Sequence, residues 1–454
     1  MTGRVDQHMQ IQSTECSNGS NVTLFVSSKS AASERRFDKA MSVASLKERL
    51  EPITGVPAST SKLFLCSGDG NTRICALDDD SKALGFYPVE DALHIQVVGE
   101  KDSAFVHPDA KRARFLTLNI FLRPPGIKNN SSDHKNARNE MFGKHFLKNF
   151  DIVALQEMFS YGSCRSSQMV QYGRKHGFEF SVSSPAKSVF NGQIDGGLII
   201  LSKYPIVRTE KITYRRGVHA DRFSAKGAIY AKIALSSNFF VHVFTTHLQS
   251  SPDLTSNVSD PSVVTRLGQI AALKEFIDDC TKNKAENEPI VLLGDINTNG
   301  RDNSGVLGAS SEEYKMIYQI LNGNAAKFVS PCADAGGAPP VTRRASVPGL
   351  ERRYSVRDLA YEKYGEHPIT YADVYPGTKI PRETVLTLSE DLGECCSLDY
   401  IFLMNSAGAP EPGSAPLNYK IENTQVERFI VLEEPFTQLS DHYGISTELV
   451  FKHF

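Results

Sequence analysis

The sequence predicts an α/β protein of the α+β type, with a small N-terminal domain followed by a large one. The first observation is that residues 21–98 contain several short strand-like runs and one helix-like run. The second is that a series of apolar runs follows residue 112, and these runs end on polar side chains. The run at 289–298 stops at Gly294-Asp295-Ile296-Asn297. Runs of this length that are rich in Val, Ile and Leu are typical of buried strands.

Length and composition limit the class of protein. The chain has 454 residues, a net charge of −2, 40% hydrophobic residues and 22% charged residues. This length suggests two or three domains, or one large and one small domain. A near-neutral charge argues against a protein that coats nucleic acid, so we expect no nucleic-acid partner.

The cysteines and the apolar runs indicate a compartment. The eight cysteines include no Cys-x-x-Cys pair, which argues against a disulfide framework or a zinc site, and we expect Cys395 and Cys396 to be buried thiols. The first twenty residues are polar, and no apolar run reaches the roughly 18 residues that cross a bilayer. We therefore expect a cytoplasmic protein.

The N-terminal part is predicted to be a separate module. We expect a disordered tail at 1–20, a domain at 21–98 and a charged linker at 99–111. The domain should contain strands at 22–26, 35–37, 63–66 and 93–98, and a helix at 42–50 that Ser42 opens. Three of its stretches, at 33–37, 55–59 and 84–91, resemble the ubiquitin-like domain of tubulin-folding cofactor B. The resemblance implies a β-grasp module that docks to an unidentified protein partner.

The large domain, residues 112–454, should contain many strands that begin or end on polar residues. One helix is expected at 262–280, and strands are expected at 115–120, 151–157, 196–206, 228–234, 239–244, 289–295, 397–403 and 439–445. Burial of so many polar groups without partners would be costly. Convergence on one pocket explains them, and the polar residues are Asn119, Glu157, His247, Asp295, Asp399, Asp441 and His442.

Asp295 and Asn297 suggest the chemistry of this pocket. Two residues apart on an extended chain, their side chains would point to the same side. A carboxylate and a carboxamide at the edge of a core need a partner, and a hard cation, a phosphate or a polarised water would each serve. Taken alone, the pair could equally be a turn.

Six motifs give a more specific indication. Their form and order resemble the deoxyribonuclease I-like endonuclease/exonuclease/phosphatase superfamily, and they are Asn119, Gln156-Glu157, Thr246-His247, Gly294-Asp295-Ile296-Asn297, Leu398-Asp399-Tyr400 and Ser440-Asp441-His442. The resemblance implies a four-layer α/β sandwich. It also implies cleavage of phosphodiesters or phosphomonoesters with Mg²⁺, or with Mn²⁺ as an alternative.

The same resemblance implies a role for each residue. Glu157 would be the principal metal carboxylate, with Asn119 beside it and Asp441 completing the metal cluster. Asp295 and Asn297 would position the attacking water and the phosphate.

Two histidines would complete the machinery. His442 would be the general base or its close partner, oriented by Asp399. His247 would steady the phosphate or the leaving group. Histidine titrates near neutrality, which suits proton transfer.

The substrate has to be predicted from other motifs. The stretches at 119–125 and 195–206 resemble neutral sphingomyelinases, which also carry an Asp and a Lys five positions apart before a Gly. Asp221 and Lys226 keep this spacing, and Gly227 follows. The resemblance implies that the two side chains pair as a switch beside the active site. The alternative is an incidental ion pair worth less than about 1 kcal/mol.

The preferred hypothesis is a Mg²⁺-dependent sphingomyelin phosphodiesterase that releases ceramide and phosphocholine at a membrane, with peripheral membrane contact. Alternatives are an inositol phosphosphingolipid phospholipase C, a nuclease or an inositol-phosphate phosphatase. A non-enzymatic tubulin-cofactor-like module is a third class. Arg343-Arg344-Ala345-Ser346 resembles a kinase site, although an unmodified loop is the simpler interpretation.

Overall fold

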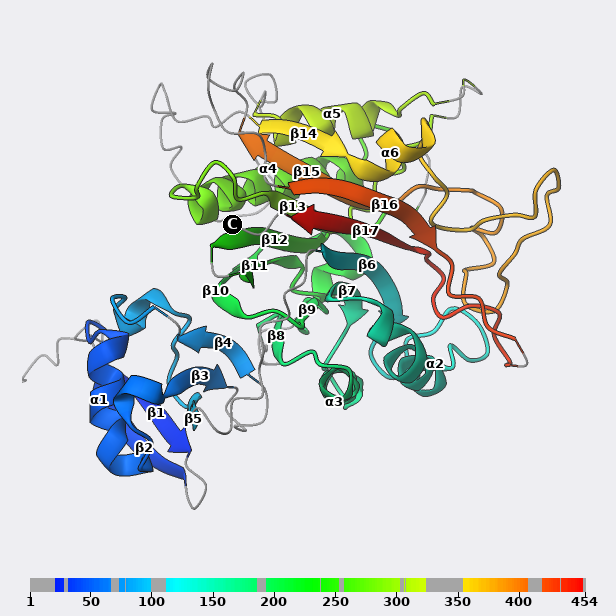
Figure 1. Cartoon of the computed structure of the whole chain (residues 1–454). Helices are drawn as coiled ribbons and strands as arrows, with labels where there is room; N and C mark the ends of the chain where they lie inside the picture. The colour runs from blue at the N-terminus through cyan, green and yellow to red at the C-terminus, as the bar shows by residue number, and fades with distance from the viewer. Residues whose placement is uncertain are drawn as a thin grey trace, which may run out of the picture. The chain divides into compact units, whose positions relative to one another are not determined.

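The chain forms two compact units. The first comprises residues 1–70 and 77–102, and the second comprises residues 71–76 and 103–454. Figure 1 shows the computed structural model of the chain. It describes residues 21–27, 32–66, 73–77, 79–98, 112–185, 193–236, 238–252, 257–302, 306, 308–323, 354–406, 419–432 and 434–451. The predicted tail at 1–20, the linker at 99–111 and Ser346 lie outside these residues.

The first unit has the predicted mixture of strands and one helix. Its elements are β1 (Asn21–Ser27), β2 (Ala32–Asp38), α1 (Val43–Thr54), β3 (Lys62–Cys66) and β5 (His94–Val98), while β4 (Arg73–Leu77) lies where the two units divide. β1 pairs antiparallel with β2 and parallel with β5, and β3 pairs antiparallel with β5. The hydroxyl of Ser42 caps α1 by accepting from the amide of Ser45, as the sequence predicts.

The described strands between residues 112 and 451 lie in two sheets. Within the first sheet they follow the order β16-β17-β6-β7-β9-β8, and the second, six-stranded sheet has the order β10-β11-β12-β13-β15-β14. The first sheet consists of β6 (Arg112–Leu122), β7 (Ile152–Met158), β8 (Phe180–Ser183), β9 (Ile199–Ser202), β16 (Tyr419–Glu427) and β17 (Gly444–Phe451). The second consists of β10 (Ile206–Thr213), β11 (Gly227–Ser236), β12 (Phe239–His247), β13 (Ile290–Asp295), β14 (Tyr354–Asp358) and β15 (Asp399–Ser406).

Helices cover the outer face of each sheet, and this completes four layers (Figure 1). Buried side chains of α4 (Pro261–Thr281) and α5 (Glu312–Leu321) share one core with β11, β12, β13 and β15. α2 (Lys135–Met141) and α3 (Arg165–Lys175) pack on β6, β7 and β9 through a second core. A short sixth helix, α6 (Leu359–Tyr364), follows β14. The predicted α+β four-layer sandwich is therefore confirmed.

The inner faces of the two sheets meet. β13 contacts both β6 and β7. Polar residues at this interface are paired, because the side chain of Gln156 donates to Thr117 on β6 and to Thr245 on β12, each at 3.1 Å. The sheets are thus held in register directly beneath the ends of β7 and β12.

Two predicted strands need correction. The run at 196–206 is not one strand, because β9 ends at Ser202 and β10 begins at Ile206 in the other sheet. Pro205 lacks an N–H, and the hydroxyl of Ser202 bonds with the backbone of Tyr204, so the ladder stops here. The run at 439–445 is mostly a loop, since β17 begins at Gly444.

The pairing of parallel strands sets the position of the polar residues. β6 and β7 are parallel neighbours in one sheet, and β12 and β13 are parallel neighbours in the other. The carboxyl ends of each pair therefore lie at one edge of their sheet. Among the described residues, no helix is both long enough and apolar enough to cross a membrane.

Candidate active site

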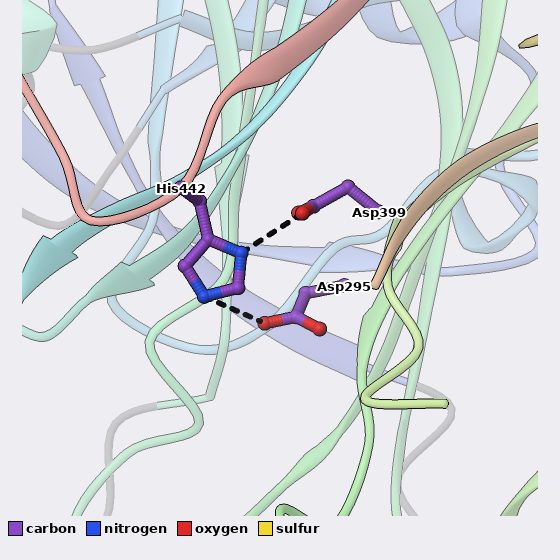
Figure 2. Close-up of side chains that lie close together, drawn as sticks. All are labelled: Asp295, Asp399 and His442. Carbon is purple, nitrogen blue, oxygen red and sulfur yellow. Dashed lines mark hydrogen bonds and ion pairs between the residues drawn. The ribbon is translucent and has the colours of Figure 1, made fainter. Parts of the chain in front are cut away.

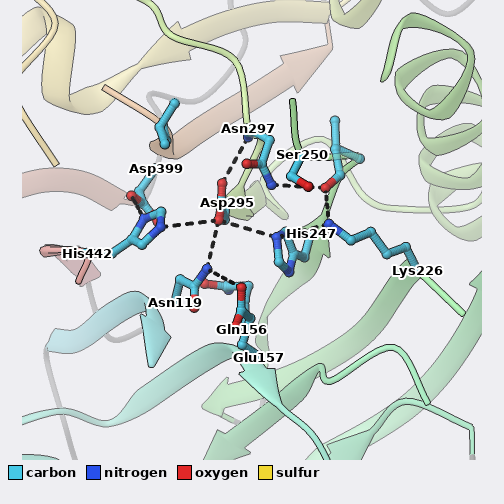
Figure 3. A network of polar contacts seen from close by, with 12 residues as sticks. Asn119, Gln156, Glu157, Lys226, His247, Ser250, Asp295, Asn297, Asp399 and His442 are labelled. Carbon is cyan, nitrogen blue, oxygen red and sulfur yellow. Dashed lines mark hydrogen bonds and ion pairs between the residues drawn. The ribbon is translucent and has the colours of Figure 1, made fainter. Parts of the chain in front are cut away.

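Asp295 is the centre of the polar network, at the end of β13 (Figure 3). β12 places His247 opposite Asp295. The two strands approach closely because Gly294 has no side chain, and a Cβ there would lie 2.2 Å from the carbonyl oxygen of Thr246. From the other sheet, Asn119 donates its amide Nδ2 to Asp295 Oδ2 at 2.9 Å. Asp295 therefore joins the ends of both parallel strand pairs.

His442 connects Asp295 to a second buried carboxylate, Asp399 (Figure 2). Its Nδ1 lies 2.8 Å from Asp399 Oδ2, and its Nε2 lies 3.9 Å from Asp295 Oδ2. Burial lowers the pKa of His442, but the two carboxylates outweigh burial and raise this pKa well above its usual value. Burial raises the pKa of Asp399 to about 6, although His442 opposes the shift.

These three residues could either bind a metal ion or transfer a proton. One ligand atom from each lies within 4.8 Å of the others, which is close enough for a shared metal ion. However, Nδ1 of His442 is already hydrogen-bonded to Asp399. One imidazole between two carboxylates is an arrangement that suits proton transfer, and this role of Asp295, His442 and Asp399 stays a prediction.

His247 lies on the opposite side of Asp295 and has the opposite electrostatics. Its Nε2 lies 3.4 Å from Asp295 Oδ2 and 3.2 Å from the Lys226 ammonium. Burial lowers the pKa of His247, and the charge of Lys226 lowers it further. The pKa values of the two histidines are thus shifted in opposite directions, that of His442 upward and that of His247 downward, a division that suits separate proton-transfer roles.

The predicted metal carboxylates lie beside this network. Asn119 donates Nδ2 to Glu157 Oε1 at 3.3 Å as well as to Asp295. Glu157 Oε2 is buried and has no hydrogen-bond partner among the described residues. Burial, assisted by the charge of Glu157, raises the pKa of Asp441 to about 7. An unpartnered carboxylate oxygen beside a second poorly stabilised carboxylate fits a cation with oxygen ligands.

Asn119 lies beside Glu157 as the sequence predicts, whereas Asn297 does not lie as the sequence suggests. The Oδ1 of Asn119 accepts from the amide of Phe121, and its Nδ2 bridges the carboxylates of Glu157 and Asp295. Asn297 is not on an extended chain, because its φ is +53°. Its backbone N–H donates to Asp295 Oδ1 at 2.9 Å, and its Nδ2 donates to Leu248.

Strained backbone surrounds the network. Phe121, Glu157 and Asn297 all have φ between +53° and +56°, in the left-handed region that non-glycine residues rarely adopt. Phe121 and Glu157 are the penultimate residues of β6 and β7, and Asn297 lies two residues beyond β13. Such conformations persist only where the surrounding structure fixes them, which is typical of functional sites.

The predicted pairing of Asp221 and Lys226 is confirmed. The Lys226 ammonium lies 2.9 Å from Asp221 Oδ2, and the Lys226 side chain is only 6% exposed. Ser250 also donates to Asp221 Oδ2, from its amide at 2.7 Å and its hydroxyl at 3.0 Å. Burial raises the pKa of Asp221, but Lys226 and His247 outweigh burial and lower it below its usual value. This pair is not the exposed, incidental ion pair of the alternative interpretation.

A cavity of about 390 Å³ unites the predicted residues. Nine of the ten line its wall, and these are Asn119, Glu157, Asp221, Lys226, His247, Asp295, Asn297, Asp441 and His442. The tenth, Asp399, contacts His442 and supports it. The structure therefore brings together every residue that the motifs indicate, while their individual roles stay predictions.

Two residues near the site have no signal in the sequence. Arg138, on α2, is fully buried and donates four hydrogen bonds to backbone carbonyls, at Asp133, Ile120, Phe121 and Leu439. In the sequence it looks like an ordinary cation on a short helix. Tyr371 lies against His442, with 4.9 Å between the ring centroids, and also lines the cavity.

Comparison with known proteins assigns both units. Residues 21–104 match the ubiquitin-like domain, and residues 116–442 match the endonuclease/exonuclease/phosphatase family. A sphingomyelinase of Dictyostelium discoideum is 31% identical over an alignment of 389 residues, which covers 75% of this chain and 79% of that protein. Sphingomyelinase C of Bacillus cereus is 28% identical over an alignment of 233 residues, which covers 48% of this chain and 66% of that protein.

Solved structures include similar chains. A crystal structure of a beta toxin double mutant from Staphylococcus aureus, with bound magnesium ions, aligns with a TM-score of 0.46 at 20% identity. The alignment covers 74% of this chain and 98% of that one. The family match, which spans most of the chain, and the relative with 31% identity agree with the motifs and the cavity. This chain is a phosphodiesterase that belongs to the endonuclease/exonuclease/phosphatase family.

Proposed function

We propose that the chain is a divalent-cation-dependent sphingomyelin phosphodiesterase that releases ceramide and phosphocholine. The observation that carries the proposal is the buried pair of Asp221 and Lys226 in the wall of the catalytic cavity. Neutral sphingomyelinases carry these residue types at this spacing. The relatives from D. discoideum and B. cereus that are named sphingomyelinases support the same substrate.

Glu157 and Asp441 would hold the cation. Both carboxylates line the cavity, and one oxygen of Glu157 has no partner among the described residues. Mg²⁺ suits a site with few carboxylates because it keeps several of its waters, and Mn²⁺ accepts the same oxygen ligands. When bound, the cation would stabilise negative charge on the non-bridging phosphate oxygens.

The side chains around Asp295 would activate the water. Asp295 and Asn297 both line the cavity, where they can orient a water toward phosphorus. As the water oxygen bonds to phosphorus, its proton would pass to His442, which Asp399 orients. His442 can accept this proton only when its imidazole is unprotonated. The carboxylates of Asp399 and Asp295 raise the pKa of the imidazole, and they therefore make unprotonated His442 a strong base.

Lys226 and His247 would act on the other side of the phosphate. The Lys226 ammonium is buried and lies 3.2 Å from His247 Nε2. It can stabilise charge on the phosphoryl oxygens and on the departing ceramide oxygen. The bond between phosphorus and that oxygen breaks as the bond to water forms. The departing oxygen takes up a proton from solvent, and His442 returns the proton of the attacking water to solvent.

The cavity mouth carries apolar side chains that suit a lipid surface. Ile127 and Phe223 line the cavity and are 49% and 52% exposed. Arg222 stacks on Phe223, with 4.8 Å from its guanidinium carbon to the ring centroid. Apolar and cationic side chains together favour peripheral contact with a membrane that carries anionic lipid. We therefore propose that a cytoplasmic enzyme associates with membranes through this edge.

Hydrolysis of a substrate panel tests the proposal. Sphingomyelin, an inositol phosphosphingolipid and DNA are compared with Mg²⁺, with Mn²⁺ and with EDTA. We expect sphingomyelin to be the best substrate and its hydrolysis to stop reversibly in EDTA. Glu157→Gln should lose most activity and keep its fold, because it removes a charge without changing volume. A preference for DNA would contradict the substrate, and full activity in EDTA would contradict the metal.

A further inference from the structure

We propose that Tyr371 and Asp391 form the subsite that binds the quaternary ammonium of the choline headgroup. This inference rests on the proposed function and adds a specificity determinant to it. Both residues line the catalytic cavity but neither belongs to the metal-binding or proton-transfer residues described above.

The position of Tyr371 suits a headgroup attached to the reacting phosphate. Its ring is tilted by 45° to the ring of His442, with 4.9 Å between the centroids. The backbone also holds it there, because Tyr371 forms β-bridges with both His442 and Cys396. In phosphocholine an ethylene group separates the ester oxygen from the nitrogen, so the ammonium must lie about one side chain away from the phosphate. Tyr371, whose ring contacts the imidazole of His442 in the cavity wall, lies within that reach of a phosphate attacked beside His442.

The chemistry of the two residues suits a cation that cannot donate hydrogen bonds. A quaternary ammonium is bound by aromatic faces and by diffuse negative charge. The hydroxyl of Tyr371 donates to Asp391 Oδ2 at 2.7 Å, which places a carboxylate at the edge of the ring. Burial raises the pKa of Asp391, as does the charge of Glu390, although the Tyr371 hydroxyl opposes this. A bound cation would therefore relieve an unfavourable charge.

Other aromatic rings of the cavity are less suitable. The guanidinium carbon of Arg123 lies 4.2 Å from the ring centroid of Phe121, and that of Arg222 lies 4.8 Å from the ring centroid of Phe223. A second cation on these rings would meet a positive charge. Phe159 also lines the cavity, packs against Gly197, and is the aromatic residue to compare with Tyr371.

The test compares sphingomyelin with its uncharged isostere, in which a 3,3-dimethylbutyl group replaces choline. The two lipids share the phosphate and the leaving group and differ in one charge. In mixed micelles with Mg²⁺, we expect the wild type to prefer sphingomyelin in kcat/KM by about tenfold or more. Tyr371→Leu and Asp391→Asn should each reduce the preference to about twofold or less, and Tyr371→Phe should keep part of it.

The control variants decide between explanations. Phe159→Leu should retain the preference of the wild type, and thermal unfolding checks that every variant is folded. Equal losses on both lipids in the Tyr371 and Asp391 variants would overturn the subsite and leave the proposed function intact. Loss of the preference in Phe159→Leu alone would also overturn it. A wild type that hydrolyses neither lipid would overturn the proposed function and the subsite together.

Discussion

At the scale of single residues, Asp441 combines burial with a charge that its surroundings stabilise poorly. Its pKa in the folded chain is about 7, against an ordinary value of 3.8. The folded state therefore binds this proton more tightly than the unfolded state does. The stability that protonation contributes is fully present below about pH 4 and is lost as the pH rises through about 7.

Asp441→Asn should escape this loss. In EDTA, the variant should unfold at a higher temperature than the wild type at pH 8, and the advantage should be smaller at pH 5. The raised pKa of Asp441 corresponds to at most about 4 kcal/mol in the free energy of unfolding. Added Mg²⁺ should reduce the advantage, because a cation stabilises the charged carboxylate of the wild type. Equal unfolding temperatures at pH 8 would contradict the assignment.

Lys226 and Asp221 should matter for turnover and much less for folding. Lys226→Ala should lower kcat by about 10²-fold or more, as expected when a group that stabilises transition-state charge is lost. Asp221→Ala should also lower kcat, because Lys226 then has no carboxylate to orient it. The matched control is Lys144→Ala, which breaks the exposed pair of Lys144 and Glu140. Steady-state hydrolysis of sphingomyelin in mixed micelles gives the rates, and near-wild-type turnover in both site variants would remove their proposed role.

The sequence predicts the site residues better than their conformations. The polar residues Asp295, His247 and Glu157 are recognisable in the sequence as site residues because they stand at the ends of apolar strands, where burial of an unpaired polar or charged group is costly. The left-handed backbone of Glu157 and Asn297 has no such signal, since neither residue is glycine. Tyr371 was missed because a tyrosine in a loop-rich region resembles any core aromatic residue until the fold brings it to His442.

At the scale of elements, Arg138 joins α2 to two segments that carry the site. Its guanidinium donates to Ile120 and Phe121, just after Asn119, and to Leu439, just before the Ser440-Asp441-His442 motif. Burial lowers the pKa of Arg138 to about 10, although Asp441 and other carboxylates oppose this. One side chain thus links β6 to the segment that carries Asp441, a proposed metal ligand.

Replacement of Arg138 should cost both stability and activity. Arg138→Met leaves several buried carbonyls without a donor, so we expect a loss of about 3–5 kcal/mol. Arg138→Lys should keep the charge but recover only part of the stability, because an ammonium cannot reproduce the planar fork. Urea unfolding measures the difference, with Arg112→Met, at a more exposed ion pair, as the control. A loss below about 1 kcal/mol in Arg138→Met would show that water replaces the guanidinium.

The sequence predicts the existence of the long strands and helices better than it predicts where strands begin and end. Periodicity predicts β6, β7, β12, β13 and α4 because each has a long apolar run or face. It did not separate β9 from β10, since the apolar run continues across Pro205 while the chain changes sheet. It also missed β4, whose five residues, Arg73–Leu77, are too few for a clear pattern.

At the scale of the whole molecule, the catalytic machinery lies within the second unit. Every residue of the proposed site falls between Asn119 and His442, and each compact unit has its own buried core. A chain that starts at Lys111 should therefore fold and hydrolyse detergent-dispersed sphingomyelin. Loss of the ubiquitin-like domain should affect docking to a partner and leave the chemistry unchanged.

A longer chain that starts at Asn71 tests whether residues 71–76 are needed for folding of the second unit. Residues 71–76 belong to the second compact unit although they lie before the linker in sequence. Thermal unfolding and kcat/KM are compared for the two chains and the full-length protein. If only the longer chain is soluble, this short segment is needed for folding, and if neither is active, the predicted boundary is wrong.

The site joins residues that are far apart in the sequence, and this has a consequence for synthesis. The hydroxyl of Ser440 donates to the carbonyl of Asn119 across 321 residues, and β17 completes the first sheet by pairing with β6. A ribosome that has made β6, β7, β12 and β13 has made Asn119, Glu157, His247 and Asp295, yet Asp441 and His442 are still missing. The nascent chain should therefore remain catalytically silent until β17 emerges. An enzyme with the proposed lipid substrate would in this way acquire its activity only as its translation is nearly complete.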